Sequence, residues 1–152
     1  MPAVLVRQAV LADLAVLAPL FDGYRQFYGR APDRAAAETF LRARFDHGES
    51  VLFLATDPDR RPLGFTQLYP SFSSVSLART FILNDLFVVP GRRRTGVGSD
   101  LLRAATDHAR ALGAVRVTLN TDIRNTPAQA VYEARGWKRD REYFVYHFLP
   151  QG

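Results

Sequence analysis

The chain has 152 residues, of which 47% are hydrophobic and 23% charged, a composition typical of one soluble globular domain with a sizeable core. Its apolar runs fall short of the ~20 residues that span a bilayer, and its beginning lacks the basic and apolar regions of a signal peptide. It contains no cysteine, which excludes disulfides, thiol catalysis and cysteine zinc sites. We expect a single domain over residues 1–152 in the cytoplasm, without a membrane partner.

Positive charge is in excess. The formal net charge is +5, because 20 lysines and arginines outnumber 15 aspartates and glutamates, and the isoelectric point is near 10.1. All but one of the basic residues are arginines. Such an excess favours an anionic partner, either nucleic acid or a phosphate-bearing cofactor; a compositional preference for arginine is the alternative. The charge is scattered apart from one cluster, Arg92-Arg93-Arg94. We therefore expect a cofactor phosphate at this cluster and no nucleic-acid partner.

Apolar periodicity and turn residues predict the secondary structure. In chain order the predicted elements are a strand (4–10), two helices (11–28 and 34–45), three strands (51–55, 62–69 and 81–88), a helix (97–112), a strand (115–119), a helix (126–134) and a last strand (142–149). Asp33 is the expected N-cap of the second helix, and residues 70–74 are predicted to form a loop rich in serine. This order predicts an α/β fold with a mixed sheet and helices on both faces.

The segment from Val88 to Gly98 joins a predicted strand to a predicted helix through a turn rich in glycine and arginine. A helix N-terminus exposes backbone N–H groups that lack intrahelical partners, and its dipole favours a negative charge. With the neighbouring arginines, these groups predict a phosphate site. A nucleotide P-loop is excluded because no lysine follows Gly98, and a dinucleotide fingerprint is excluded because Leu101 stands at its third glycine position.

Two segments resemble motifs of the GCN5-related N-acetyltransferase (GNAT) family. Residues 88–98 match that family's V-x-P-x-x-R-x-x-G-x-G pyrophosphate loop at every specified position. Residues 125–137 resemble its N-x-x-A-x-x-L-Y-E-x-x-G-F segment, in the expected order along the chain. A helix start with two glycines by coincidence is the alternative for the first motif, and the second motif argues against it. The resemblance covers residues 81–137 and implies the GNAT fold and acetyl-CoA as acetyl donor.

The resemblance also implies a cofactor site. Backbone N–H groups of residues 93–99 would bind the pyrophosphate, with Gly96 and Gly98 allowing close approach. The strand before the turn would contact the pantetheine arm, and an N–H near Val88 would stabilise an oxyanion. Asn125 would bind the pantetheine or its linker, cap the following helix, or do both. The residues expected to bind the cofactor are Leu86, Phe87, Val88, Arg93, Arg94, Thr95, Gly96, Val97, Gly98, Ser99, Asn125 and Tyr132.

The general acid that the resemblance implies is Tyr132. A thiol with a pKa of ~8.5 is more acidic than tyrosine at ~10, so protonation of a thiolate is uphill by about 2 kcal/mol unless a hydrogen bond assists it. Asp85 and Asn84 occupy the strand in which diamine acetyltransferases carry a carboxylate base. Asn84 cannot accept a proton, which leaves Asp85, acting directly or through water, or an amine that arrives deprotonated. A structural carboxylate at Asp85 and a core tyrosine at Tyr132 are the alternatives.

Aromatic and polar residues of the first helix and the middle strands resemble the acceptor cleft of the diamine and yeast histone/D-amino-acid acetyltransferase branch. With Asp22, Glu38, Glu49 and Asp85 nearby, aromatic walls suit a cationic amine. The expected acceptor residues are Tyr24, Phe27, Tyr28, Gln67, Tyr69 and Phe72. The alternative for Phe27, Tyr28 and Phe72 is a place in the core.

The sequence thus predicts an N-acetyltransferase that transfers acetyl from acetyl-CoA to a primary amine in a ternary complex, since no cysteine can carry the acetyl group. A small amine, either a polyamine or an amino acid, is the expected acceptor. A protein lysine or N-terminus is the alternative acceptor, and a non-catalytic acyl-CoA-binding module is the alternative class. No metal is expected, because His47, His108 and His147 lack ligand spacing. The aromatic last strand predicts a homodimer.

Overall fold

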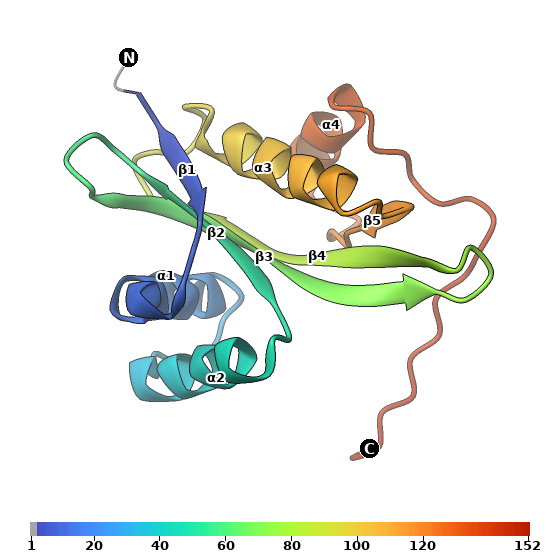
Figure 1. The fold of residues 1–152 in the computed structure, drawn as a ribbon, viewed down its shortest axis with the longest axis horizontal. Helices are drawn as coiled ribbons and strands as arrows, with labels where there is room; N and C mark the ends of the chain where they lie inside the picture. The colour runs from blue at the N-terminus through green and yellow to red at the C-terminus, as the bar shows by residue number, and fades with distance from the viewer. Residues whose placement is uncertain (1–2) are drawn as a thin grey trace. The chain divides into compact units, whose positions relative to one another are not determined.

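The computed structural model describes residues 3–152 and divides into two compact units, one ending at Leu119 and the other spanning Asn120–Gly152. The larger unit contains a five-stranded sheet in the order β1-β2-β3-β4-β5 (Figure 1). Neighbouring strands are antiparallel except β4 and β5, which are parallel, so the predicted mixed sheet is confirmed. The elements of this unit are β1 (Leu5–Gln8), the 3-10 helix η1 (Leu11–Asp13), α1 (Leu14–Phe27), α2 (Arg34–His47), β2 (Val51–Thr56), β3 (Pro62–Ser73), β4 (Ala78–Val88), α3 (Val97–Ala111) and β5 (Arg116–Thr118).

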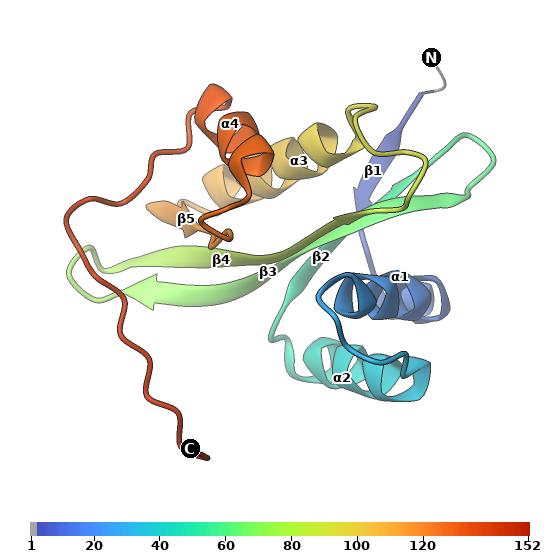
Figure 2. The same cartoon turned by 180° about the vertical axis from the view of Figure 1, so that it is seen from behind.

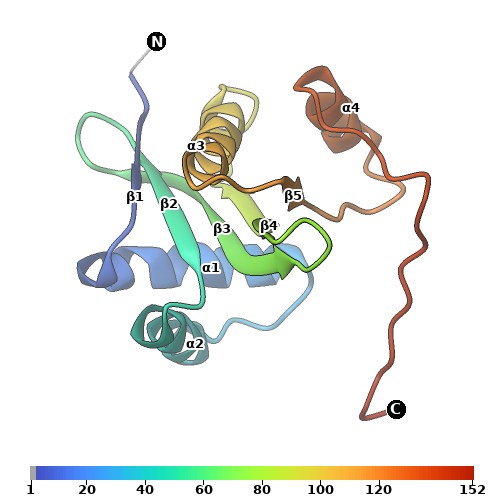
Figure 3. The ribbon, with the colours of Figure 1, turned by 45° about the vertical axis from the view of Figure 1, so that its right-hand side comes forward.

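Helices cover both faces of this sheet. The rear and oblique views show α1 and α2 together on one face and α3 on the other (Figure 2, Figure 3). The apolar stripe of α1, which includes Leu17, packs against Phe65 and Phe87 of the sheet, and Leu41 of α2 joins the same core. On the opposite face, α3 buries its own stripe, including Leu101. The helical spacing of apolar residues therefore determines which side of each helix meets the sheet.

The boundaries of α2 follow capping chemistry that is visible in the sequence. The side chain of Asp33 accepts a hydrogen bond from the N–H of Ala36 at 3.1 Å, as expected for an N-cap. Gly48 ends the helix with a φ of 62°, in the left-handed region that favours glycine. The first helix was expected from residue 11, but α1 begins at Leu14. The residues before it form a 3-10 turn, in which the N–H of Val10 donates a hydrogen bond to the Asp13 carboxylate.

Gly64 allows β3 to approach the end of β4 closely. A Cβ atom at this position would lie 2.4 Å from the carbonyl oxygen of Phe87, far inside van der Waals contact. Gly64 pairs with Val88, the last residue of β4. The missing side chain therefore sets the direction in which the chain leaves β4 toward the arginine-rich turn.

The predicted loop at residues 70–74 is wrong for its first four residues, because β3 continues to Ser73 and forms a long hairpin with β4. Pro70 lies inside this strand, opposite Phe81. The pairing of β3 with β2 ends at Leu68, so the strand beyond that point is an edge, where proline is tolerated. The sequence signal of proline and serine indicated a loop, but hairpin pairing with β4 decides the conformation.

The predicted last strand is also wrong. Residues 142–149 form no strand, and their aromatic side chains, such as Phe144 and Tyr146, are exposed. A strand requires hydrogen bonds to a neighbouring strand, and these residues pair with none among residues 3–152. The homodimer expected from this segment and the single domain over residues 1–152 both stay predictions.

The smaller unit contains α4 (Thr126–Ala134), whose predicted bounds are confirmed. Asn125 caps it by accepting a hydrogen bond from the N–H of Ala128 at 3.3 Å, and Pro127 occupies the first turn. Within residues 3–152, no helix combines the length and the apolar character that crossing a membrane demands.

His108 of α3 lies against two aromatic rings of the sheet, those of Phe53 and Phe81, at centroid distances of 5.5 and 5.7 Å. Its Nε2 atom is buried and has no hydrogen-bond partner in the described part of the chain. Burial lowers the pKa of this imidazole below its ordinary value of 6.5. At a pH below that value the unfolded chain binds a proton that the folded chain resists, so acid reduces the free energy of unfolding.

We expect His108→Phe to weaken this pH dependence, because phenylalanine keeps the ring contacts and cannot be protonated. Urea unfolding followed by circular dichroism from about pH 7 to about pH 5 measures the effect. His47→Gln, on the exposed face of α2, is the control and should keep the wild-type slope. An unchanged slope in His108→Phe would contradict the assignment.

Candidate active site

A β-bulge in β4 places polar residues at the centre of the sheet. Gln67 of β3 pairs with Asp85, but the next residue, Leu68, pairs with Leu83, so Asn84 is an extra residue in β4. In a regular strand Asn84 and Asp85 would point to opposite faces. The bulge breaks that alternation, and both residues line one cavity.

Asp85 is a buried carboxylate with amide donors on both oxygens. Its exposure is 1%. The side-chain nitrogen of Asn84 donates to Oδ1 at 2.8 Å, and the side-chain nitrogen of Gln67 donates to Oδ2. The backbone of this region is also fixed, because the Thr66 hydroxyl donates to the Asp85 carbonyl at 2.8 Å and the Tyr24 hydroxyl donates to the Asn84 carbonyl at 3.1 Å.

Burial and nearby charges shift the pKa values of the ionisable side chains around Asp85. Burial raises the pKa of Asp85, although hydrogen bonds from Asn84 and Gln67 oppose that rise. Burial, and then the charge of Asp85, raise the pKa of Tyr24 and bring the pKa of Tyr69 to about 12. The site is therefore a low-dielectric region in which Asp85 can bind and release a proton at a higher pH than an exposed aspartate.

The cavity beside Asp85 has a volume of about 380 Å³ and lies between the two helices α1 and α2 and the strands β3 and β4. Volumes of about 300–1,000 Å³ are typical of small-molecule sites. Its lining residues are Phe21, Tyr24, Arg25, Ala36, Ala37, Phe40, Tyr69, Asn84 and Asp85. The rings of Phe21 and Phe40 stack at a centroid distance of 5.6 Å, which makes part of the wall aromatic.

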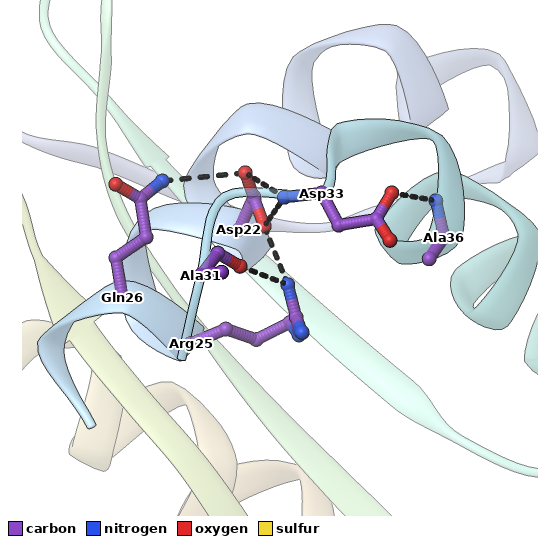
Figure 4. Close-up of polar contacts among 6 residues, drawn as sticks. All are labelled: Asp22, Arg25, Gln26, Ala31, Asp33 and Ala36. Atoms are coloured by element: carbon purple, nitrogen blue, oxygen red, sulfur yellow. Dashed lines mark hydrogen bonds and ion pairs between the residues drawn. The ribbon is translucent and has the colours of Figure 1, made fainter. Parts of the chain in front are cut away.

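The junction of α1 and α2, which borders this cavity, depends on Asp22 (Figure 4). Its buried carboxylate accepts hydrogen bonds from Arg25 at 2.7 Å, from Gln26 at 3.2 Å and from the N–H of Asp33 at 3.1 Å. Arg25 also donates to the carbonyl of Ala31 at 3.3 Å. The expectation that Asp22 attracts the substrate is not supported, because its oxygens already join the two helices.

The arginine-rich turn presents a row of unpaired donors. The N–H of Arg92 donates to Val89, and the N–H of Asp100 donates to Gly96. The seven N–H groups between them, of residues 93–99, donate to no acceptor in residues 3–152. Gly96 is the N-cap of α3 with a φ of 92°, and Arg94 also has a positive φ of 63°. Such conformations at the start of a helix are typical of turns that bind anions.

The end of β4 has a free edge. The parallel pairing of β4 with β5 covers only Thr80 to Ile82. From Leu83 to Val88, β4 pairs with β3 alone among the described residues. The predicted cofactor residues Leu86, Phe87 and Val88 therefore lie on a strand with one unpaired edge, which can accept hydrogen bonds from an extended ligand.

The side chain of Arg93 is directed back toward the fold. Its Nε donates to the carbonyl of Val88 at 3.0 Å, and its guanidinium lies over the ring of Phe27 at 5.1 Å. The Thr95 hydroxyl donates to the carbonyl of Arg92. These contacts hold the turn to the end of β4 and to the last residue of α1.

The expected acceptor residues fall into two groups. Tyr24, Gln67 and Tyr69 meet at Asp85, and none of Phe27, Tyr28 and Phe72 lines the cavity. The alternative that these three are core residues is wrong, because each is more than 60% exposed. Phe72 stands near the end of the hairpin with Arg79 over its ring at 5.1 Å.

Sequence reasoning missed Phe21 and Phe40 as cavity residues. Their helical positions look like core positions, and only the cleft between α1 and α2 distinguishes the two roles. The signal that could have found Phe21 is its place on α1 close to Tyr24, with which its ring stacks at a centroid distance of 6.3 Å. Phe40 belongs to α2, and only the packing of α2 against α1 brings its ring onto that of Phe21.

In the smaller unit, Tyr132 lies on α4 with its ring 6.1 Å from that of Trp137. Its carbonyl accepts the N–H groups of Arg135 and Trp137 at 3.0 Å, which closes the end of the helix. Residues 3–152 contain no group of three or more side chains arranged to hold a metal ion.

The comparisons with known proteins agree with the two motifs. The chain matches the acetyltransferase (GNAT) family over residues 17–137. It is 48% identical over 141 residues to the uncharacterized N-acetyltransferase YhfO of Bacillus subtilis (strain 168), covering 93% of this chain and 94% of that protein. A crystal structure of a probable acetyltransferase has a TM-score of 0.91 and 44% identity, with 95% of this chain and 97% of the other covered.

An aminoglycoside N-acetyltransferase in complex with CoA shares the fold alone, with a TM-score of 0.77, 20% identity, and coverage of 97% of this chain and 96% of the other. The GNAT fold implied by the motifs is thus confirmed, and the specific branch within the family stays a prediction. The chain belongs to the GNAT family and is an acetyl-CoA-dependent N-acetyltransferase.

Proposed function

We propose that this enzyme acetylates the primary amine of a small molecule that enters the cavity beside Asp85. The observation that carries the proposal is the burial of this carboxylate in a cavity of small-molecule size, about 380 Å³. A buried carboxylate attracts an ammonium group and can accept its proton. A protein lysine would need to extend its side chain into the same cleft, and a small amine fits without that constraint.

The start of α3 would bind the diphosphate of acetyl-CoA through the N–H groups of residues 93–99. Support comes from the two glycines of the turn, which the protein itself does not require for packing. A Cβ at Gly96 would meet nothing within 4 Å, and a Cβ at Gly98 would meet only Val88 Cγ2 at 3.8 Å. Gly96 has a positive φ, which favours glycine, but Gly98 does not. We infer that the missing side chain at Gly98 leaves room for the ligand.

When bound, acetyl-CoA supplies the acetyl group as a thioester. Asp85 holds the acceptor ammonium and takes one proton from it, directly or through water, so that the nitrogen can form the new bond to the acetyl carbon. As the carbon–sulfur bond breaks, Tyr132, which the second motif assigns as acid, would give its proton to sulfur. The nitrogen loses a second proton as the amide forms, and this proton would return to the Tyr132 oxygen directly or through water. Asn125 would position the pantetheine. Asn84 cannot exchange protons and keeps the Asp85 carboxylate oriented.

The direct test of the function is a panel of small amines, amino acids and lysine peptides with acetyl-CoA, measured by thiol release and by the mass of the product. Acetylation of small amines in preference to peptides is expected. Turnover confined to peptides would contradict the proposed acceptor class.

Gly98→Ala should weaken acetyl-CoA binding by about tenfold or more without loss of stability, because alanine favours a helix by roughly 0.5–1 kcal/mol over glycine. Gly113→Ala, at the other end of α3 where φ is 72°, is the matched control. It should reduce stability and leave binding unchanged. Calorimetric titration with acetyl-CoA and thermal unfolding measure the two effects, and normal binding by Gly98→Ala would refute the pyrophosphate site.

Asp85→Asn should reduce kcat/KM for the best amine by about 10²–10⁴. The wild-type kcat/KM should rise with pH through a pKa above the ordinary aspartate value of 3.8, because Asp85 is active only when deprotonated. In the Asp85→Asn variant, kcat/KM should no longer rise with pH in this range. Asp107→Asn, an exposed carboxylate of α3, serves as control. A variant with normal rate and profile would show that Asp85 is structural.

Tyr132→Phe should lower kcat while the Kd for acetyl-CoA changes little, because only the proton donor is removed. Single-turnover rates measure the effect on the chemical step, and calorimetric titration measures the Kd for acetyl-CoA. Equal losses in kcat and affinity would assign Tyr132 to binding or folding, and an unchanged kcat would exclude it as the acid.

A further inference from the structure

A second cavity lies next to the first. It has a volume of about 560 Å³ and is lined by Phe40, Arg44, Gly48, Glu49, Tyr69 and Pro70. Phe40 and Tyr69 line both cavities, so the two share a wall formed by one turn of α2 and the middle of β3. A molecule with its amine at Asp85 can therefore extend past this wall into the second cavity.

The second cavity contains a cation that is held in one position. The guanidinium of Arg44 lies over the ring of Phe40 at 4.4 Å, and its Nε donates to Glu49 at 3.2 Å. The side chain is 24% exposed, against 54% for Glu49. The terminal nitrogens Nη1 and Nη2 of Arg44 have no acceptor among residues 3–152. A preoriented guanidinium with two free nitrogens matches the two oxygens of a carboxylate.

Arg25, the cation of the first cavity, differs from Arg44 in its partner. Its charge is balanced by the buried carboxylate of Asp22 at 2.7 Å, and it also holds the carbonyl of Ala31 (Figure 4). The partner of Arg44 is the exposed Glu49, which solvent screens. Glu49 therefore orients Arg44 without cancelling its attraction for an anion inside the cavity.

Arg44 and Asp85 carry opposite charges, and both affect the phenol of Tyr69. The charge of Asp85 raises the pKa of Tyr69, and that of Arg44 lowers it. Tyr69 lines both cavities, whereas Asp85 lines only the first and Arg44 only the second. A ligand of matching charge has an ammonium group at the Asp85 end and an anionic group at the Arg44 end.

We propose that Arg44 binds a carboxylate of the acceptor, so that the enzyme prefers amines whose far end carries a carboxylate over diamines and neutral amines. The proposal rests on the proposed function, since it assumes that the amine is bound at Asp85. It makes Arg44 a specificity-determining residue that does not touch the reacting atoms.

The test compares three ligands of equal chain length: 6-aminohexanoate, 6-aminohexanamide and 1,6-diaminohexane, together with their shorter homologues. Binding is measured first, by calorimetric titration, so that the result does not depend on turnover. We expect the carboxylate to bind more tightly than the amide and the diamine at the best length. Arg44→Gln should remove that preference and weaken carboxylate binding by about ten- to a hundredfold, as expected for a lost charge-assisted pair.

Arg42→Gln is the matched control, because Arg42 lies on the same helix, pairs with Glu38 on the surface at 3.7 Å and lines neither cavity. It should keep the wild-type preference. Arg44→Lys keeps the charge and should retain part of the carboxylate preference. Such partial retention would show that Arg44→Gln loses the anion site and is not merely misfolded. Thermal unfolding checks the folding of each variant. In the acetylation assay, Arg44→Gln should raise KM for the carboxylate and leave kcat within about twofold.

Equal binding of the three ligands by the wild type, or a carboxylate preference that survives in Arg44→Gln, would overturn the proposal. A preference for the diamine that Glu49→Gln abolishes would assign the cavity to a second ammonium instead. A failure of the proposed function gives another result: the carboxylate ligand would still bind, but no amine would be acetylated.

Discussion

The shift of register between β3 and β4 is the constraint on which the site depends. Because Asn84 is an extra residue in β4, Asp85 faces Gln67 while Asn84 turns toward the same cavity. The two amides then satisfy both oxygens of a carboxylate that would otherwise be buried at great cost. A regular ladder would have directed one of these side chains into the core beneath α3.

The same strand connects the cavity beside Asp85 to the arginine-rich turn. Gly64 lets β3 approach the end of β4, and Arg93 ties the turn to the carbonyl of Val88. One continuous segment therefore carries the carboxylate, the free strand edge and the row of unpaired N–H groups. Asp85 and the first of these N–H groups lie close together along the chain, so the proposed positions of the amine and the acetyl donor both depend on one strand and one turn.

Burial controls the electrostatics of the acceptor side. Asp85, Tyr24 and Tyr69 share a region of low dielectric, in which each charge affects the others more than it would at the surface. Arg44 contributes the opposite sign at the far wall. By contrast, surface pairs such as Arg42 with Glu38 contribute little, because solvent screens them.

Local chemistry in the sequence determined most of the elements and both motifs. The Asp33 cap, the glycine that ends α2, the bounds of α4 and the turn of residues 93–99 depend on neighbouring residues, and such signals can be recognised from the sequence alone. The absence of a strand at residues 142–149 could not be recognised in the same way, because an aromatic segment forms a strand only where another strand is available to pair with it.

The tertiary structure alone decided the β-bulge, the continuation of β3 through Pro70, and the meeting of Phe40 and Arg44 with Tyr69. These features join residues far apart in the chain, and their energies come from strand pairing and burial that no local pattern encodes. For the same reason, the sequence identified Asp85 as a candidate but could not show that it is buried, and it gave no indication of a cation across the cavity.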